Sequence, residues 1–269
     1  MSKNYEELKF TDDFMFCKVL ENNPNICKEL LELFLNVKIN NVVCVSKQKP
    51  IEITSDGKGI RLDVYLEDDN NSVYDIEMQT VLKKDLPKRS RYYQGMIDLN
   101  LIERGAMYKE LKRSYVIFIC LDDPFERGLP LYHFSNECRE MPALSLNDEA
   151  FKVFVNAQGR KADMSDDMKA FLEYLCSEKT DSSLAKEIDA EVKKARSHEE
   201  WRNEYMTLLM RDQEKREEGR EEGREEGFGL AASIIDYLTN HPLESAEEIA
   251  EKLSCSIEQV MQIRNLMKL

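Results

Sequence analysis

The chain has 269 residues with a formal charge of −14, and 42% of its residues are hydrophobic. This length allows one sizeable core and a smaller second unit, whereas the acidity argues against broad, nonspecific binding of nucleic acids. The longest apolar runs, such as SYVIFICL at 114–121, are much shorter than the about 18 residues of a membrane span. Because the charged N-terminus also lacks the apolar core of a signal peptide, we expect a cytoplasmic protein with no membrane segment.

The first half of the chain alternates between helical and strand patterns. Helices are predicted where apolar residues recur three and four apart or where Pro and Gly bound a segment, at 11–20, 25–35 and 88–105. Strands are predicted from β-branched and alternating runs at 41–46, 60–67, 72–80, 114–121 and 130–134. The order of these elements predicts an α/β fold with a mixed sheet flanked by helices.

From Asp166 onward the patterns are helical only, at 166–176, 184–195 and 199–211. The sequence REEG then occurs three times, at 216–227. Like charges four apart and a glycine in each repeat, which costs about 1 kcal/mol relative to Ala, make an isolated helix marginal. We therefore expect a solvated tether, with an oligomerisation stalk as the alternative.

The last forty or so residues have the outline of a helix-turn-helix unit. Ser245 and Ser256 each begin a Ser-x-x-Glu/Gln capping box that precedes a short apolar-periodic segment. Residues 231–269 contain six acids and three bases, so a packing or partner-binding module is favoured over DNA contact. The expected organisation is an α/β domain at 1–145, a helical extension at 146–212, the REEG tether at 213–229 and a helical tail at 230–269.

The seven cysteines are scattered without a Cys-x-x-Cys pair, and the three histidines are isolated, so neither a disulfide framework nor a zinc site is expected. One stretch departs from the overall acidity. Between Lys83 and Arg113 nine Lys or Arg residues outnumber four acids. If DNA binds this protein, this is where contact is expected first.

Two acids, Asp63 and Glu77, are equidistant from Asn70 in the turn-forming segment between two predicted strands. In a hairpin closed symmetrically about Asn70, their side chains would lie opposite each other on one face, about 5 Å apart. Two carboxylates at this distance repel unless one is protonated or a cation lies between them. Oxygen ligands favour Mg²⁺ or Mn²⁺. The alternative is a register shifted by one residue, with both acids facing water.

The segment RLDVYLEDDNNSVYDIEMQ at 61–79 closely resembles the active-site hairpin of the PD-(D/E)XK nuclease superfamily, in its branch of recombination-promoting nucleases and transposases. TDDFMFCKVL, LPKRSRYYQGMID and YVIFIC are also similar to recurring segments of that branch. The resemblance covers roughly residues 5 to 140. It implies a restriction-endonuclease-like sheet, followed here by an all-helical C-terminal region.

The resemblance also implies roles for particular residues. Asp63 and Glu77 would hold Mg²⁺ or Mn²⁺ together with the backbone carbonyl of Met78, and the ion would polarise a phosphodiester oxygen and activate the attacking water. Gln79 stands where most of the superfamily has Lys, and its amide supplies no positive charge. The candidates to supply that charge are Lys83, Lys84 and Arg89.

Many members of the superfamily contribute another acid from the first helix. Asp13 matches that segment, with Glu29 and Glu32 as alternatives, and a helix N-cap is the equally open structural role for Asp13. The residues expected to contact DNA are Lys83, Lys84, Lys88, Arg89, Arg91 and Gln94. For Tyr92 and Tyr93, core packing is favoured over stacking on bases.

The expected function is a metal-dependent DNA endonuclease associated with recombination or mobile elements. The alternative is a catalytically weak nuclease-like scaffold that binds DNA or a protein partner, and an anti-phage nuclease would use the same site. A nuclease that cuts both strands is often a dimer, so a homodimer is a further expectation.

Overall fold

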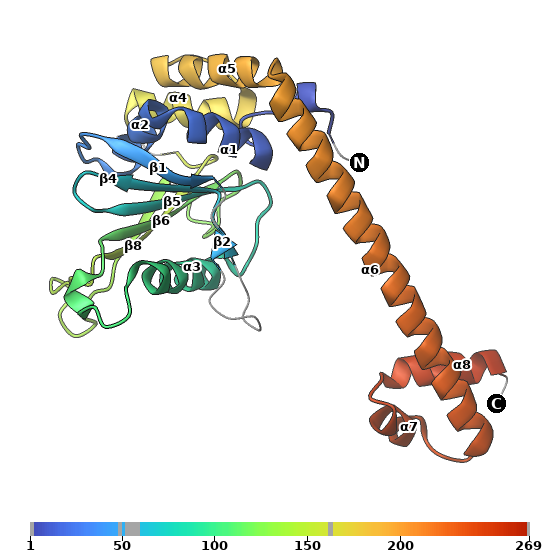
Figure 1. The fold of residues 1–269 in the computed structure, drawn as a ribbon. Coiled ribbons are helices and arrows are strands. Elements are labelled where there is room, and N and C mark those ends of the chain that lie inside the picture. Colours follow the sequence, from blue (N-terminus) through green and yellow to red (C-terminus); the bar gives the residue numbers. More distant parts are fainter. Residues whose placement is uncertain (1–2, 48–49, 52–59, 161–163, 268–269) are drawn as a thin grey trace. The chain divides into compact units, whose positions relative to one another are not determined.

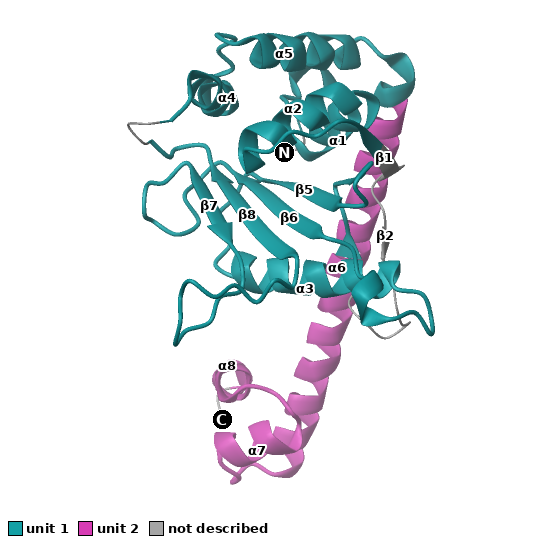
Figure 2. Ribbon diagram, turned by 90° about the vertical axis from the view of Figure 1, so that its left-hand side faces the viewer, with its two compact units in different colours: residues 1–202 teal, residues 203–269 magenta. Residues whose placement is uncertain are grey.

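The computed structural model describes residues 3–47, 50–51, 60–160 and 164–267. Two compact units divide the chain, residues 1–202 and residues 203–269 (Figure 2). No described helix is both long and apolar enough to cross a membrane.

The first unit is built on a six-stranded mixed sheet with the order β1-β4-β5-β6-β8-β7. Its strands are β1 (Val42–Lys47), β4 (Val64–Asp68), β5 (Val73–Gln79), β6 (Ser114–Cys120), β7 (Leu131–Phe134) and β8 (Ala150–Asn156). The central pairs β5–β6 and β6–β8 are parallel, and the outer pairs are antiparallel. A separate two-stranded sheet pairs β2 (Pro50–Ile51) with β3 (Ile60–Arg61).

Helices cover both faces of this sheet (Figure 1). One face carries α1 (Asp13–Asn22), α2 (Pro24–Leu35), α4 (Asp166–Ser177) and α5 (Ser183–Arg196), and the other carries α3 (Leu86–Leu101). Single turns of 3₁₀ helix occur at Tyr5–Glu7 and Tyr108–Glu110. The mixed sheet between two helical layers confirms the predicted α/β fold class.

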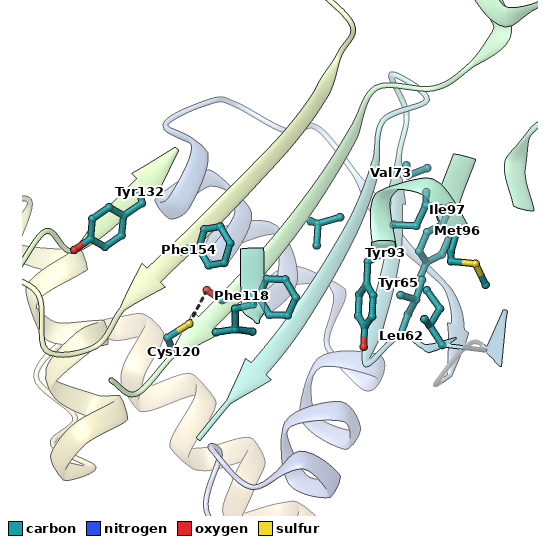
Figure 3. Close-up of a cluster of buried hydrophobic side chains, with 13 residues drawn as sticks. Leu62, Tyr65, Val73, Tyr93, Met96, Ile97, Phe118, Cys120, Tyr132 and Phe154 are labelled. Carbon is teal, nitrogen blue, oxygen red and sulfur yellow. Dashed lines mark hydrogen bonds between the residues drawn. The ribbon is translucent and has the colours of Figure 1, made fainter. Parts of the chain in front are cut away.

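The interior between α3 and the sheet is an aromatic and aliphatic cluster (Figure 3). Tyr93 and Ile97 of α3 pack there with Phe118 of β6 and Phe154 of β8, whose rings stack with centroids 5.6 Å apart. Fully burying one such side chain contributes about 1.5–3 kcal/mol. The cluster holds α3 against the sheet. It therefore also determines where the side chains on the first turns of α3, such as Arg89, are placed.

Strand β8 was not among the predicted elements. Its sequence, AFKVFVN, lies within the expected helical extension at 146–212, but it pairs with both β6 and β7. The sheet therefore continues past residue 145, the expected end of the nuclease-like domain. Residues 153–156 are all buried, so this half of the strand lacks the polar–apolar alternation that identifies a half-buried strand.

The second unit contains most of α6 (Glu199–Asn240), together with α7 (Ala246–Lys252) and α8 (Ile257–Met267). Ile234, Leu238, Ile249 and Val260 form its core. Both predicted capping boxes are present at the starts of α7 and α8. The REEG repeat, predicted to be a solvated tether, lies within α6 as helix, and its side chains are exposed.

Candidate active site

A cleft with a volume of about 740 Å³ lies where the end of β5 meets α1 and α3. Its lining includes most of the predicted site residues, namely Asp13, Asp63, Met78, Gln79, Lys83, Lys88, Arg89 and Arg91. Arg61, which the sequence analysis did not select, also lines the cleft, and its guanidinium lies 3.3 Å from the Asp13 carboxylate. Residues far apart in the sequence are thus brought to one edge of the sheet.

The β4–β5 hairpin is symmetric about Asn70, because Val64 pairs with Ile76 and Glu67 with Val73. This confirms the predicted register. The predicted strand at 60–67 is nevertheless interrupted, and Asp63 lies at a bend between β3 and β4. The bend ties Asp63 to β5, since its N–H donates to Glu77 Oε1 (3.0 Å) and the Met78 N–H donates to Asp63 Oδ2 (3.3 Å).

The Glu77 carboxylate is fully buried and pairs with Arg89 of α3. One guanidinium nitrogen of Arg89 lies 2.6 Å from Glu77 Oε2, and another donates to Gln79 Oε1 at 2.9 Å. The Nε of Arg89 donates to the Tyr93 hydroxyl (2.9 Å). The Gln79 amide in turn donates to the Met78 carbonyl oxygen (2.8 Å). A cation therefore lies directly beside Gln79, the position that carries Lys in most of the superfamily.

The Asp63 carboxylate faces α1 instead. One ligand atom each from Asp13, Cys17 and Asp63 lies within 4.8 Å of the others. The N-cap of α1 is Asp12, so the alternative capping role for Asp13 is wrong and its side chain is directed to the cleft. Glu29 and Glu32, the alternatives to Asp13, lie on α2 and are not among the residues that line this cleft.

Burial and mutual repulsion raise the pKa values of the acids at this site. Burial, and then the charge of Asp13, raises the pKa of Asp63 to about 7. Burial, and then the charge of Asp63, raises the pKa of Glu77 to about 8, although Arg89 opposes the shift. Asp75 is fully buried, neither of its carboxyl oxygens has a hydrogen-bond partner among the described residues, and desolvation raises its pKa well above the usual range.

These acids carry more negative charge than Arg89 and Arg61 neutralise. Carboxylate and carbonyl oxygens are the donors that Mg²⁺ and Mn²⁺ prefer, and a bound cation would offset the burial and the mutual repulsion that raise the pKa values of Asp63 and Glu77. The donor set therefore fits a divalent metal. The Glu77 carboxylate contacts Arg89 of α3, whereas the Asp63 carboxylate lies near Asp13 and Cys17 of α1. For Glu77 to bind an ion through Oε2, its contact with Arg89 would have to loosen.

The predicted DNA-contacting residues separate into two groups. Lys83, Lys88, Arg89 and Arg91 line the cleft, whereas Lys84 is exposed outside that lining.

Gln94 is buried between α3 and β6, and its amide donates to Ser114 Oγ (2.5 Å), so the predicted DNA contact of Gln94 is wrong. The helical period explains this, because Ser90, Tyr93, Gln94 and Ile97 share the buried face of α3. Tyr93 packs in the core as predicted, whereas Tyr92 is 41% exposed and lines the cleft, so the prediction of core packing is wrong for Tyr92.

The three-layer architecture, with paired acids on a hairpin at the open end of the sheet, is that of a restriction-endonuclease-like α/β protein. Residues 10–139 match the family described as PD-(D/E)XK nuclease family transposase. This match confirms the predicted resemblance over that part of the chain. The matched range includes every residue that lines the cleft. Comparisons with curated proteins and with solved structures found no match.

Proposed function

We propose that the protein is a metal-dependent DNA endonuclease that hydrolyses phosphodiester bonds during recombination or the movement of mobile elements. One observation carries the proposal. Asp63 of the hairpin, Asp13 of α1 and Arg89 of α3 line a single cleft whose rim is basic, and the buried Glu77 carboxylate pairs with Arg89 behind that lining. The family that residues 10–139 match is described as PD-(D/E)XK nuclease family transposase, which supports the proposal.

Asp63 and Glu77, with the Met78 carbonyl and Asp13, are the residues that would hold Mg²⁺ or Mn²⁺. A bound divalent ion would supply Lewis-acid polarisation of the phosphodiester and a more acidic water. The buried positions of Asp63 and Glu77 limit access of bulk water and so strengthen electrostatic interactions at the site. The chain's own contribution is to hold these oxygens in place on β5, on the bend before β4 and on α1.

We assign to Arg89 the positive charge that a lysine at position 79 would otherwise supply. It reaches the Gln79 amide from the first turns of α3, and its guanidinium can bind two phosphate oxygens at once. Gln79 would orient Arg89 and the Met78 carbonyl through its two hydrogen bonds and would not act as a base. When a metal binds Glu77, Arg89 would be released toward the substrate phosphate.

Lys83, Lys88 and Arg91 would bind phosphates on either side of the cut bond. These residues lie on the connection from β5 and on the first turns of α3 and line the cleft beside Arg89. Contacts of this kind position the duplex without reading its sequence. We therefore expect DNA binding to weaken steeply with salt.

The test is a plasmid-nicking assay with Mg²⁺ and with Mn²⁺. Wild type should cut, Asp63→Asn should not, and Asp69→Asn should cut like wild type because Asp69 is exposed at the hairpin turn. Chelation of the metal should stop cutting. Absence of metal-dependent cutting on supercoiled, linear and single-stranded DNA would refute the proposal.

A second function is favoured by the Glu77–Arg89 pair and by Gln79. An acid that already pairs with a guanidinium is a poorer metal ligand, so the fold would serve as a catalytically weak scaffold that binds DNA or a protein partner. Duplex binding at low salt that is lost on combined replacement of Lys83 and Arg91 by Ala, without cutting under any metal condition, would support this alternative. A defence role against phages would use the same chemistry and requires an assay in infected cells.

A further inference from the structure

Cys17 lies one helical turn after Asp13 on α1, so both side chains project from the same face of the helix. Its thiol sulfur and one carboxylate oxygen each from Asp13 and Asp63 lie within 4.8 Å of one another. Ligand atoms around one tetrahedral Zn²⁺ are about 3.3–3.8 Å apart, given metal–ligand distances of about 2.0–2.3 Å. A contraction of about 1 Å would thus bring all three atoms within reach of one ion.

The burial and hydrogen bonding of the Asp63 carboxylate support an ion at this position independently of the distances. Asp63 is only 7% exposed, and it is directed toward another carboxylate and a thiol. Its Oδ2 accepts a hydrogen bond from the Met78 N–H, whereas Oδ1 receives none from the residues that the structure describes. Because Asp63 lines the cleft and Oδ1 is not among the fully buried atoms without a partner, this oxygen is open to an ion in the cleft, and a largely buried carboxylate is stabilised by such a ligand.

We propose that Cys17 is a ligand of an ion held by Asp13 and Asp63. The inference rests on the proposed function in that the same ion would serve phosphodiester hydrolysis. A thiolate ligand favours Zn²⁺, Co²⁺ and Cd²⁺ over Mg²⁺, so this site should bind thiophilic ions more tightly than a purely carboxylate site. Binding would release the thiol proton to solvent.

The direct test is a Cd²⁺ titration of the reduced full-length protein, followed by the ultraviolet charge-transfer absorption of the Cd²⁺–thiolate bond. Cys17→Ala should lose the high-affinity part of this absorption and bind Cd²⁺ at least on the order of tenfold more weakly, the loss that even an outer-shell partner can cause. Cys27→Ala is the matched control, because Cys27 is equally buried and its thiol donates to the Leu20 carbonyl (3.2 Å). This control should titrate like wild type.

Asp63→Asn retains Cys17 and tests the site from another element. It should weaken Cd²⁺ binding and reduce the absorption. Unchanged Cd²⁺ affinity and absorption in Cys17→Ala would overturn the proposal, because another cysteine would then be the source. If Cys17→Ala did not fold, as judged by circular dichroism, an Asp63→Asn protein with wild-type Cd²⁺ binding would overturn it equally.

The same proteins separate this inference from the proposed function. If wild type cuts with Mg²⁺ but Cys17→Ala binds Cd²⁺ like wild type, the inference that Cys17 is a ligand is refuted and the proposed nuclease function stands. If Cd²⁺ binding depends on Cys17 but the protein cuts no DNA, the ligand inference stands and the proposed nuclease function is refuted.

Discussion

Replacement of Arg89 by Ala should both slow cutting and destabilise the fold in a pH-dependent way. The change removes a guanidinium 2.6 Å from the buried Glu77 carboxylate, together with hydrogen bonds to Gln79 and Tyr93. Removing one partner of a buried ion pair costs about 3–5 kcal/mol. Because the Arg89 side chain is 24% exposed, we expect the lower end, about 3 kcal/mol, where Glu77 is ionised.

The pKa of Glu77 determines the pH window. Its folded-state pKa is raised to about 8, so at pH 6 the carboxyl largely holds its proton and the variant loses only two hydrogen bonds, about 1–2 kcal/mol. Above pH 8 the wild-type carboxylate is ionised beside Arg89, and in the variant each further unit of raised pKa costs about 1.4 kcal/mol. The destabilisation should therefore grow as pH rises through about 8.

Thermal unfolding in chelator at pH 6 and pH 9 measures this difference. At about 2–4 °C per kcal/mol, Tm should fall by roughly 6–12 °C at pH 9 and by roughly 2–8 °C at pH 6. Cutting at neutral pH should fall on the order of 10² or more in kcat/KM, as for other lost charge stabilisation. Arg91→Ala is the control, because Arg91 is exposed, and its Tm should not change with pH in this way. An equal or larger Tm loss at pH 6 would refute the reasoning.

Three other outcomes are expected. Gln79→Lys should retain or raise metal-dependent cutting in the nicking assay, and loss of cutting in a folded variant would assign the amide a specific role. Limited proteolysis should cut first between Arg211 and Gly229, where α6 is exposed and glycine-rich, whereas early cleavage within 60–120 would contradict this. Asp75→Asn should raise Tm more at pH 8 than at pH 5, because an acid whose pKa is raised in the folded state destabilises the fold increasingly as pH rises above its unfolded-state pKa; an equal change at both pH values would show that the folded-state pKa of Asp75 is not raised.

The sequence predicted local features of the site better than its tertiary contacts. The pairing across Asn70 follows from the symmetry of one hairpin, so the register of Asp63 and Glu77 could be predicted. The bend at Asp63 and the approach of Cys17 depend on how α1 packs, which no local pattern contains. Arg89 was one of three candidate cations, and only the path of the chain after β5 distinguishes it from Lys83 and Lys84.

The predictions for Gln94 of α3 and for β8 were wrong for the same reason, because tertiary contacts decide both. A count of basic and polar residues along 88–105 gives Gln94 the same standing as Arg91, whereas the helical period places Gln94 on the buried face. For β8, the buried half of the strand has no alternation, and its apolar residues were included in a region of helical patterns. Long-range pairing with β6 decides its conformation.

The position of β8 between β6 and β7 also sets an order for folding. β7 precedes β8 in the chain, yet in the six-stranded sheet its neighbour is β8. During synthesis β7 therefore cannot pair until β8, which ends at Asn156, has emerged. Until then the edge of β6 that pairs with β8 has no partner strand. A fragment that stops at residue 139, the end of the family match, would leave that apolar central strand as an unpaired edge and would be prone to aggregate.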